Sequence, residues 1–204
     1  MSFFQGSYLG LRDVLKYAVM LNRKETFRQQ QERREIEGAQ TRMEDLSSYL
    51  NDHLAGSVGA LELLDRLIDT YKGKPLERFF IDLRNEIGAD QETLKELIAS
   101  LGEEESTVRK AGAWVIEKFS RGKIQLGAKG ENEMGLCLAL EGLALGIHGK
   151  RLLWCALAVA SEALPRLRNR DYVELERRAV EQHNRVEAKR LEVARKVFCM
   201  KSTP

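Results

Sequence analysis

The chain has 204 residues, enough for one well-buried domain with an appendage. Three prolines, 7% aromatic residues and an abundance of Leu, Ala, Glu, Arg and Lys predict an all-α protein. The 33 basic and 31 acidic residues leave a formal charge of +2, so the chain has no strong field to attract nucleic acid or an anionic membrane. We therefore expect neither of them as a partner.

The cysteines and the N-terminal stretch bear on location. Cys137, Cys155 and Cys199 form an odd set without a disulfide framework, which is typical of a reducing compartment. The apolar N-terminal stretch carries Arg12 and Lys16, which a signal peptide or a membrane span tolerates poorly. These features predict a soluble, cytoplasmic protein.

The first part of the chain is predicted to be a helical arm over residues 1–42, ahead of a bundle domain over 43–200. Residues 9–21 are a candidate for a short amphipathic helix, and 22–35 are almost wholly polar, as in a solvated helix or a connecting arm. Such an arm could mediate self-association into a homodimer or larger homo-oligomer, contact another protein, or be a frayed extension.

Two long helices are expected next, joined by a short turn. A heptad of mainly apolar residues runs from Ile36 to Tyr71. Gly73 suits the end of a helix and Pro75 the first turn of the next, so the two helices should be antiparallel neighbours. The second helix has its core positions at Leu76, Phe80, Leu83, Ile87, Asp90, Leu94, Leu97 and Leu101.

A long connection follows Gly102. The acidic run 103–105 suits the positive end of a further helix over 106–120, too short to be a full bundle member. A glycine-punctuated loop, 121–130, completes the connection.

The most apolar segment, 131–164, is predicted to be a buried helix. Its expected core stripe contains two ionisable residues, which need counter-charges, hydrogen bonds or a metal if they are buried. Gly142, Gly146 and Gly149 are expected to let a neighbouring helix approach closely. The stripe consists of Met134, Leu138, Glu141, Leu145, His148, Leu152, Cys155 and Val159.

The last helix is predicted from its boundaries. Pro165 ends the preceding helix, and Asp171 with Glu174 forms an Asp-x-x-Glu capping box. The helix should run to about Phe198.

A short turn, a long connection and another short turn predict a four-helix bundle whose second and third helices run parallel. In this helix order and in the placement of Glu residues, 43–199 resembles the ferritin-like superfamily. The segment ADQETLKELIASLG is similar to one in poorly characterised bacterial ferritin-like stress proteins. The resemblance implies a ferritin-like bundle with an extra helix in its long crossover, besides the N-terminal arm.

Ferritin-like di-metal proteins place one Glu on each of two helices and a Glu-x-x-His on each of the others. Glu62 and Glu86 lie about 16 Å along their helices from the first turn, and Glu141 about 15 Å. The resemblance therefore carries the metal positions to these three carboxylates, which would take iron, manganese or zinc. No Glu-x-x-His is present, and Arg190 and Arg195 near that level would neutralise the carboxylates instead.

A second polar layer is expected about 22–32 Å from the same turn. It would join His53, Asp90, His148 and His183, whereas Glu187 lies about one to two helical turns from the level of the three carboxylates and is a further candidate ligand there. The ligands of the second layer suit zinc, iron or copper. The alternative is that each side chain forms hydrogen bonds locally in a polar layer that fixes helix register.

Two main functions remain open at this point. One is a non-catalytic bundle with a degenerate metal site and a structural, stress-related or interaction role. The other is a di-iron-type oxidase or metal-handling protein that uses the carboxylates of three helices. A partner-binding adaptor is a third class, and no catalytic triad or phosphate-binding loop is indicated.

Overall fold

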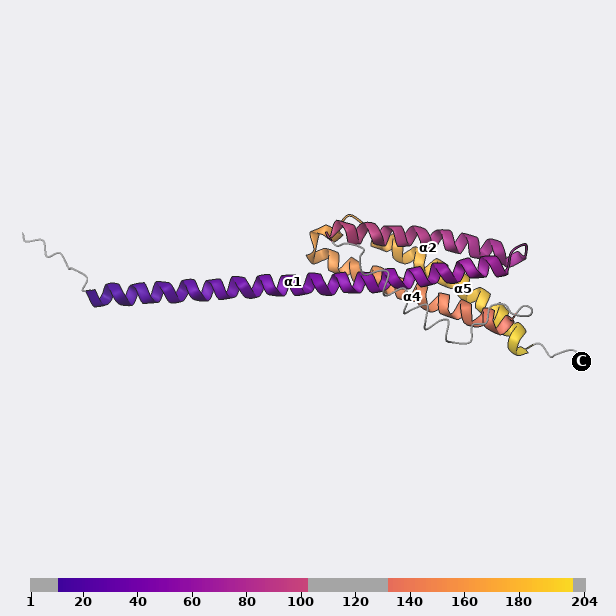
Figure 1. The fold of residues 1–204 in the computed structure, drawn as a ribbon, viewed down its shortest axis with the longest axis horizontal. Helices are drawn as coiled ribbons and strands as arrows, with labels where there is room; N and C mark the ends of the chain where they lie inside the picture. Colours follow the sequence, from indigo (N-terminus) through magenta and orange to yellow (C-terminus); the bar gives the residue numbers. More distant parts are fainter. Residues whose placement is uncertain (1–10, 103–131, 200–204) are drawn as a thin grey trace, which may run out of the picture. The chain divides into compact units, whose positions relative to one another are not determined.

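The computed structural model describes residues 11–102 and 132–199. Within them lie α1 (Leu11–Thr70), α2 (Pro75–Ser100), α4 (Glu133–Ala163), α5 (Tyr172–Cys199) and the short 3-10 helix η2 (Pro165–Leu167) (Figure 1). These ranges contain no strand, which confirms the all-α prediction. The helix expected at 106–120 and the loop expected at 121–130 lie outside the described residues.

Helix α1 is longer than the sequence pattern suggested. A short helix, an arm and a new helix from Ile36 were expected, whereas the structure has one helix over Leu11–Thr70. The reason is that residues 22–35 are good helix formers, so nothing in them stops the helix. The chain divides into two compact units, Met1–Leu46 and Ser47–Pro204, close to the expected boundary after residue 42.

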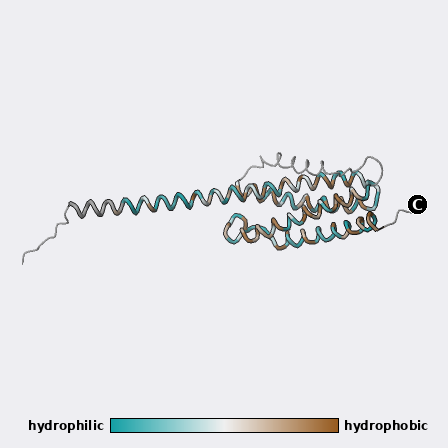
Figure 2. The backbone as a smooth tube through the Cα atoms, turned by 90° about the horizontal axis from the view of Figure 1, so that it is seen from below, coloured by the Kyte–Doolittle hydropathy of each residue, from teal (hydrophilic) through white to brown (hydrophobic). Residues whose placement is uncertain are grey.

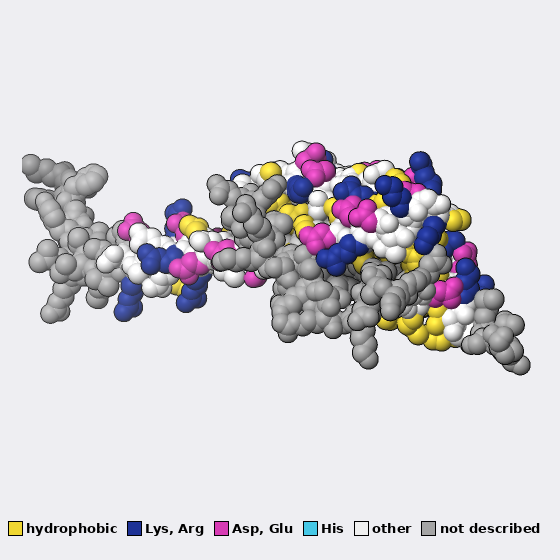
Figure 3. Space-filling view, turned by 45° about the vertical axis from the view of Figure 1, so that its right-hand side comes forward, with side chains coloured by type: hydrophobic (Ala, Val, Ile, Leu, Met, Phe, Trp, Pro, Cys, Tyr) yellow, Lys and Arg dark blue, Asp and Glu magenta, His cyan; other side chains and the backbone are white. Residues whose placement is uncertain are grey.

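In the first unit, residues 22–37 are exposed and hydrophilic (Figure 2). Charges of both signs alternate there, as the space-filling view shows (Figure 3). Arg28 pairs with Glu32 one turn along, at 3.1 Å between Nε and Oε1. Exposed pairs of this kind add only a few tenths of a kcal/mol each, so this part of α1 owes its helicity mainly to propensity.

In the second unit, inter-helix bonds fix the direction of each helix. Gln91 on α2 donates to the Ser57 hydroxyl on α1 at 2.8 Å, and Arg84 pairs with Asp65. The residue number rises on one helix as it falls on the other, so α1 and α2 are antiparallel. Gly73, with φ of 74°, and Pro75 at the helix start make the turn, as predicted.

The directions of α4 and α5 follow from the same kind of evidence, the bonds between helices. α5 runs antiparallel to both α2 and α4, and Arg166, just after α4, donates to the carbonyl of Leu101 at the end of α2. The C-terminal ends of α2 and α4 therefore meet, so these two helices run parallel, as the long connection predicted. The pairs that set the α5 direction are Glu86–Arg185, Asp90–Arg178, Glu96–Arg170 and Arg151–Glu176.

The buried face of α4 differs from the predicted one. The predicted stripe is mostly exposed, from Met134 to Val159, with Cys155 half-buried. The core instead takes Leu136, Leu140, Leu143, Ile147, Trp154 and their neighbours. The reason is that α4 is apolar on several faces, so spacing cannot select one of them, whereas burial of Glu141 and His148 would have been costly.

Helix ends follow their sequence signals. The Asp171 carboxylate accepts a hydrogen bond from the backbone N–H of Glu174 at 3.0 Å and caps α5. The Asn132 side chain does the same for Gly135 at the start of α4, at 3.1 Å. Gly102, with φ of 83°, follows the C-cap of α2.

Candidate ligand cavity

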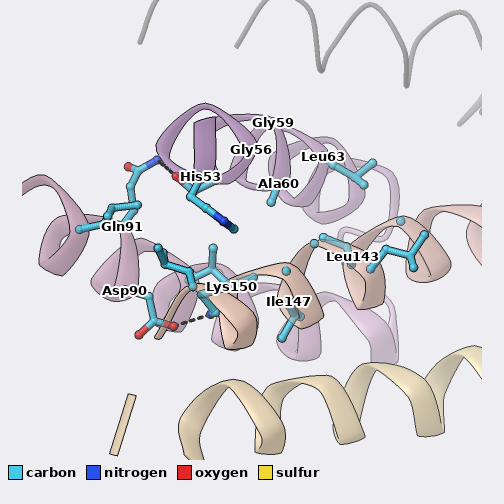
Figure 4. A pocket seen from close by; sticks show the side chains of 18 of the residues that line it. His53, Gly56, Gly59, Ala60, Leu63, Asp90, Gln91, Leu143, Ile147 and Lys150 are labelled. Atoms are coloured by element: carbon cyan, nitrogen blue, oxygen red, sulfur yellow. Dashed lines mark hydrogen bonds and ion pairs between the residues drawn. The ribbon is translucent and has the colours of Figure 1, made fainter. Parts of the chain in front are cut away.

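A cavity of about 270 Å³ lies between α1, α2 and α4, within the second unit (Figure 4). Most of its lining is apolar side chain or glycine. Such cavities hold small molecules in other proteins when a few polar groups converge on them. The lining includes His53, Gly56, Gly59, Ala60, Asp90, Gly142, Leu145, Gly146, Gly149, Lys150 and Trp154.

Five of the lining residues are glycines on facing helices, α1 and α4. A Cβ built on Gly56, Gly146 or Gly149 would meet nothing within 4 Å. The expectation that glycines on α4 allow a close helix approach is therefore wrong at Gly146 and Gly149. These glycines border open space, and their missing side chains enlarge the cavity.

One end of the cavity is polar. Asp90 is 3% exposed and accepts hydrogen bonds from Lys150 and Arg178. Gln182 donates to the same carboxylate at 3.2 Å and accepts from Lys150. Burial lowers the pKa of Lys150, while the charge of Asp90 opposes that shift. The network joins α2, α4 and α5 and leaves its buried carboxylate fully bonded.

His53 extends from α1 towards the cavity (Figure 4). Its ring packs edge-on against Tyr49, with 4.7 Å between centroids. Burial lowers the pKa of His53 and outweighs the opposite effect of Asp52. At neutral pH the imidazole is therefore uncharged, so one ring nitrogen can donate a hydrogen bond and the other can accept one.

Trp154 is also among the residues that line the cavity. The atom Nε1 is buried and has no hydrogen-bond partner among the described residues. A buried donor without an acceptor costs about 1–3 kcal/mol, and such a group in a native fold calls for an explanation. An acceptor on a bound molecule would supply one.

The structure does not gather the predicted metal ligands. Within residues 11–102 and 132–199, no three His, Cys, Asp or Glu residues lie together as a metal site requires. Glu62 is half-buried on α1, Glu86 pairs with Arg185, and Glu141 is exposed on α4. The three predicted carboxylates therefore remain apart.

The predicted second layer is also divided. Asp90 belongs to the Lys150 network, and His53 faces the cavity. His148 and His183 contact each other, with 6.0 Å between ring centroids. Glu187 bonds Arg190 through both oxygens, at 2.7 Å each.

The predicted charge-neutralising arginines have other roles. Arg190 bonds Glu187 on its own helix and influences Glu141 only through its charge. Arg195 is exposed. Glu86 and Asp90 on α2 are instead paired with Arg185, Arg178 and Lys150, which sequence reasoning missed. Two signals could have predicted the pair of Asp90 and Lys150. Asp90 is the only charged residue on the α2 core stripe, and Lys150 is a lysine inside an apolar helix.

Comparison with known proteins gives no match: no family model, no curated protein and no solved structure is similar enough to this chain to indicate a relationship. The candidate site must therefore be interpreted from its own chemistry.

Proposed function

We propose that this protein is a non-catalytic helical bundle that binds a small, mainly apolar molecule in the cavity between α1, α2 and α4. The observation that carries the proposal is open space bordered by glycines from two facing helices. Glycine within a helix costs about 1 kcal/mol relative to alanine, so several of them around one void are unfavourable for stability alone. A binding role accounts for them.

The polar groups limit the chemistry of the ligand. Asp90 is already bonded by Lys150, Arg178 and Gln182, so the polar end has no unpaired charge to offer. The uncharged ring of His53 and the unpartnered indole N–H of Trp154 remain. These groups suit a neutral molecule with one or two hydrogen-bond acceptors, such as an aromatic or medium-chain ketone or alcohol.

The proposal keeps the ferritin-like architecture. In residues 47–199, α2 and α4 run in one direction and α1 and α5 in the other, which supports a relationship to such bundles. The metal-handling alternative has less support, because its carboxylates stay apart in the described residues. A cytoplasmic location would suit the three free thiols.

A fluorescence titration with 1-aminoanthracene tests the proposal. The probe should bind the wild-type chain saturably and be displaced by neutral aromatic alcohols. Gly146→Leu and Ala60→Phe should fill the cavity and abolish binding. Gly88→Leu is the matched control, because Gly88 also borders open space on a helix but does not line the cavity.

Circular dichroism would confirm that all three variants remain folded. Equal probe binding by the cavity variants and the wild type would refute the proposal, as would equal loss in Gly88→Leu.

A further inference from the structure

A row of exposed apolar side chains runs along α4, on the face that the bundle leaves uncovered in the described part of the chain. Leu145 and Val159 are each 68% exposed and Leu152 is 51% exposed. Apolar patches also reach the surface in the space-filling view (Figure 3). We call this row, with its two ionisable members, the α4 stripe: Met134, Leu138, Glu141, Leu145, His148, Leu152, Cys155 and Val159.

The spacing of the α4 stripe alternates between four and three residues along its whole length. That is the heptad period by which two helices keep their seams together. The 25 residue steps from Met134 to Val159 cover about 38 Å, at 1.5 Å per step. A row of this length and period on the outside of a bundle matches another helix better than it matches a small molecule.

The two ionisable residues of the stripe are placed symmetrically. Glu141 lies one layer before Leu145, and His148 lies one layer after it. Glu141 has no hydrogen bond or ion pair within the described residues, and Arg190, the cation that feels its charge, is already bonded to Glu187. The ring of His148 lies beside that of His183, and no hydrogen bond or ion pair of His148 is present within the described residues. Both groups remain available to a partner.

We propose that a second copy of this chain covers the α4 stripe, in an antiparallel pair with its two-fold axis at Leu145. In this register Glu141 faces His148 of the partner subunit, and the symmetry repeats the contact. Leu138 faces Leu152 of the partner subunit, so the apolar layers also match. A parallel pair would instead place like groups opposite each other, which is unfavourable.

A lipid surface is another candidate occupant. By length and composition alone, Glu133–Ala163 is the one described helix that could cross a membrane. Glu141 and His148 in the middle of the stripe would be costly in hydrocarbon. Lys150 and Arg151 are engaged by Asp90 and Glu176 within the bundle. The charge pattern therefore favours a protein partner.

Sedimentation equilibrium of the full chain tests the pairing. The wild type should be a dimer, and Leu152→Glu should raise its dissociation constant about tenfold or more, because a carboxylate would be buried opposite leucine. Val173→Glu is the control, since Val173 is exposed on α5 and lies outside the stripe. A monomer at all concentrations, or a dimer unaffected by Leu152→Glu, overturns the proposal.

Cysteine cross-linking tests the register in a Cys155→Ser, Cys199→Ser background. Leu145→Cys should form a disulfide with itself across the axis. Leu138→Cys and Leu152→Cys should cross-link only when the two variants are mixed. Failure of both patterns in a folded protein, or a monomer that floats with anionic vesicles, overturns the proposal. Leu138 and Leu152 do not line the cavity, so the mixed cross-link between them does not depend on ligand binding there, whereas Leu145 borders both the cavity and the α4 stripe.

A charge exchange tests the polar contacts. Glu141→Lys and His148→Glu should each weaken the dimer, and the double variant should restore it, because Lys and Glu would then face each other across the axis. If the dimer of the double variant is weakened by the sum of the two single effects, the proposed register is wrong.

Discussion

Removal of the Asp90 carboxylate should be among the most damaging single changes in the bundle. Asp90 is 3% exposed and Lys150 is 14% exposed, so Asp90→Ala would leave the lysine with a poorly hydrated charge and take one partner from Arg178. Loss of one member of a buried pair costs about 3–5 kcal/mol. For a chain of this size, that lowers the midpoint of thermal unfolding by about 6–20 °C.

Urea denaturation followed by circular dichroism measures this free energy. Asp65→Ala is the matched control, because Asp65 and Arg84 form an inter-helix pair with side chains 49% and 42% exposed. That exposed pair should contribute less than about 1 kcal/mol. The double variant Asp90→Leu, Lys150→Met removes both charges, so it should lose less stability than Asp90→Leu alone. If Asp90→Ala costs no more than Asp65→Ala, the reasoning about burial is wrong.

Three further predictions concern stability. Burial lowers the pKa of His53 below its ordinary 6.5, so the contribution of the uncharged ring to the free energy of unfolding should be fully present above pH 6.5 and should fall as the pH drops below it. In urea titrations at several pH values, His53→Gln should reduce this pH dependence. Gly146→Ala should stabilise the bundle by about 0.5–1 kcal/mol, because its Cβ meets nothing, whereas Gly73→Ala at φ of 74° should destabilise it by a similar amount; opposite signs in thermal denaturation would contradict this. Asp171→Ala should cost about 1 kcal/mol through loss of the α5 cap, and an unchanged unfolding midpoint would show that the cap is dispensable.

Local signals predicted the helix ends well. Gly73, Pro75, Gly102, Pro165 and Asp171 act through the backbone of their own neighbourhood, so the sequence is sufficient to place them. Helix directions followed from the lengths of the connections. These features require no knowledge of which faces meet.

The choice of faces could not be predicted in the same way. On α2, a single apolar stripe with polar surroundings identified the core correctly from Phe80 to Leu97. On α4, several faces are apolar, and the face with the regular spacing, which contains Leu145, is exposed. Periodicity identifies a regular apolar stripe, but it does not show whether that stripe faces the core of its own bundle.

The candidate site depended on side-chain partners from distant parts of the chain. Depth along the helices placed Glu62, Glu86 and Glu141 at one level, but depth carries no information on rotation about each helix axis. The cavity is likewise a consequence of how α1 and α4 are spaced. Glycine in a helix signals either close approach or open space, and only the structure distinguishes the two at Gly146.

The indole N–H resonance of Trp154, followed by NMR during titration with a neutral aromatic ketone, would report directly on binding in the cavity. A Trp114→Phe background leaves one indole signal. If the cavity binds the ligand, this resonance should shift saturably, and the shift should disappear in Gly146→Leu but persist in Gly88→Leu. An unchanged resonance throughout the titration, or the same shift in Gly146→Leu, would contradict the assignment of the cavity as the binding site.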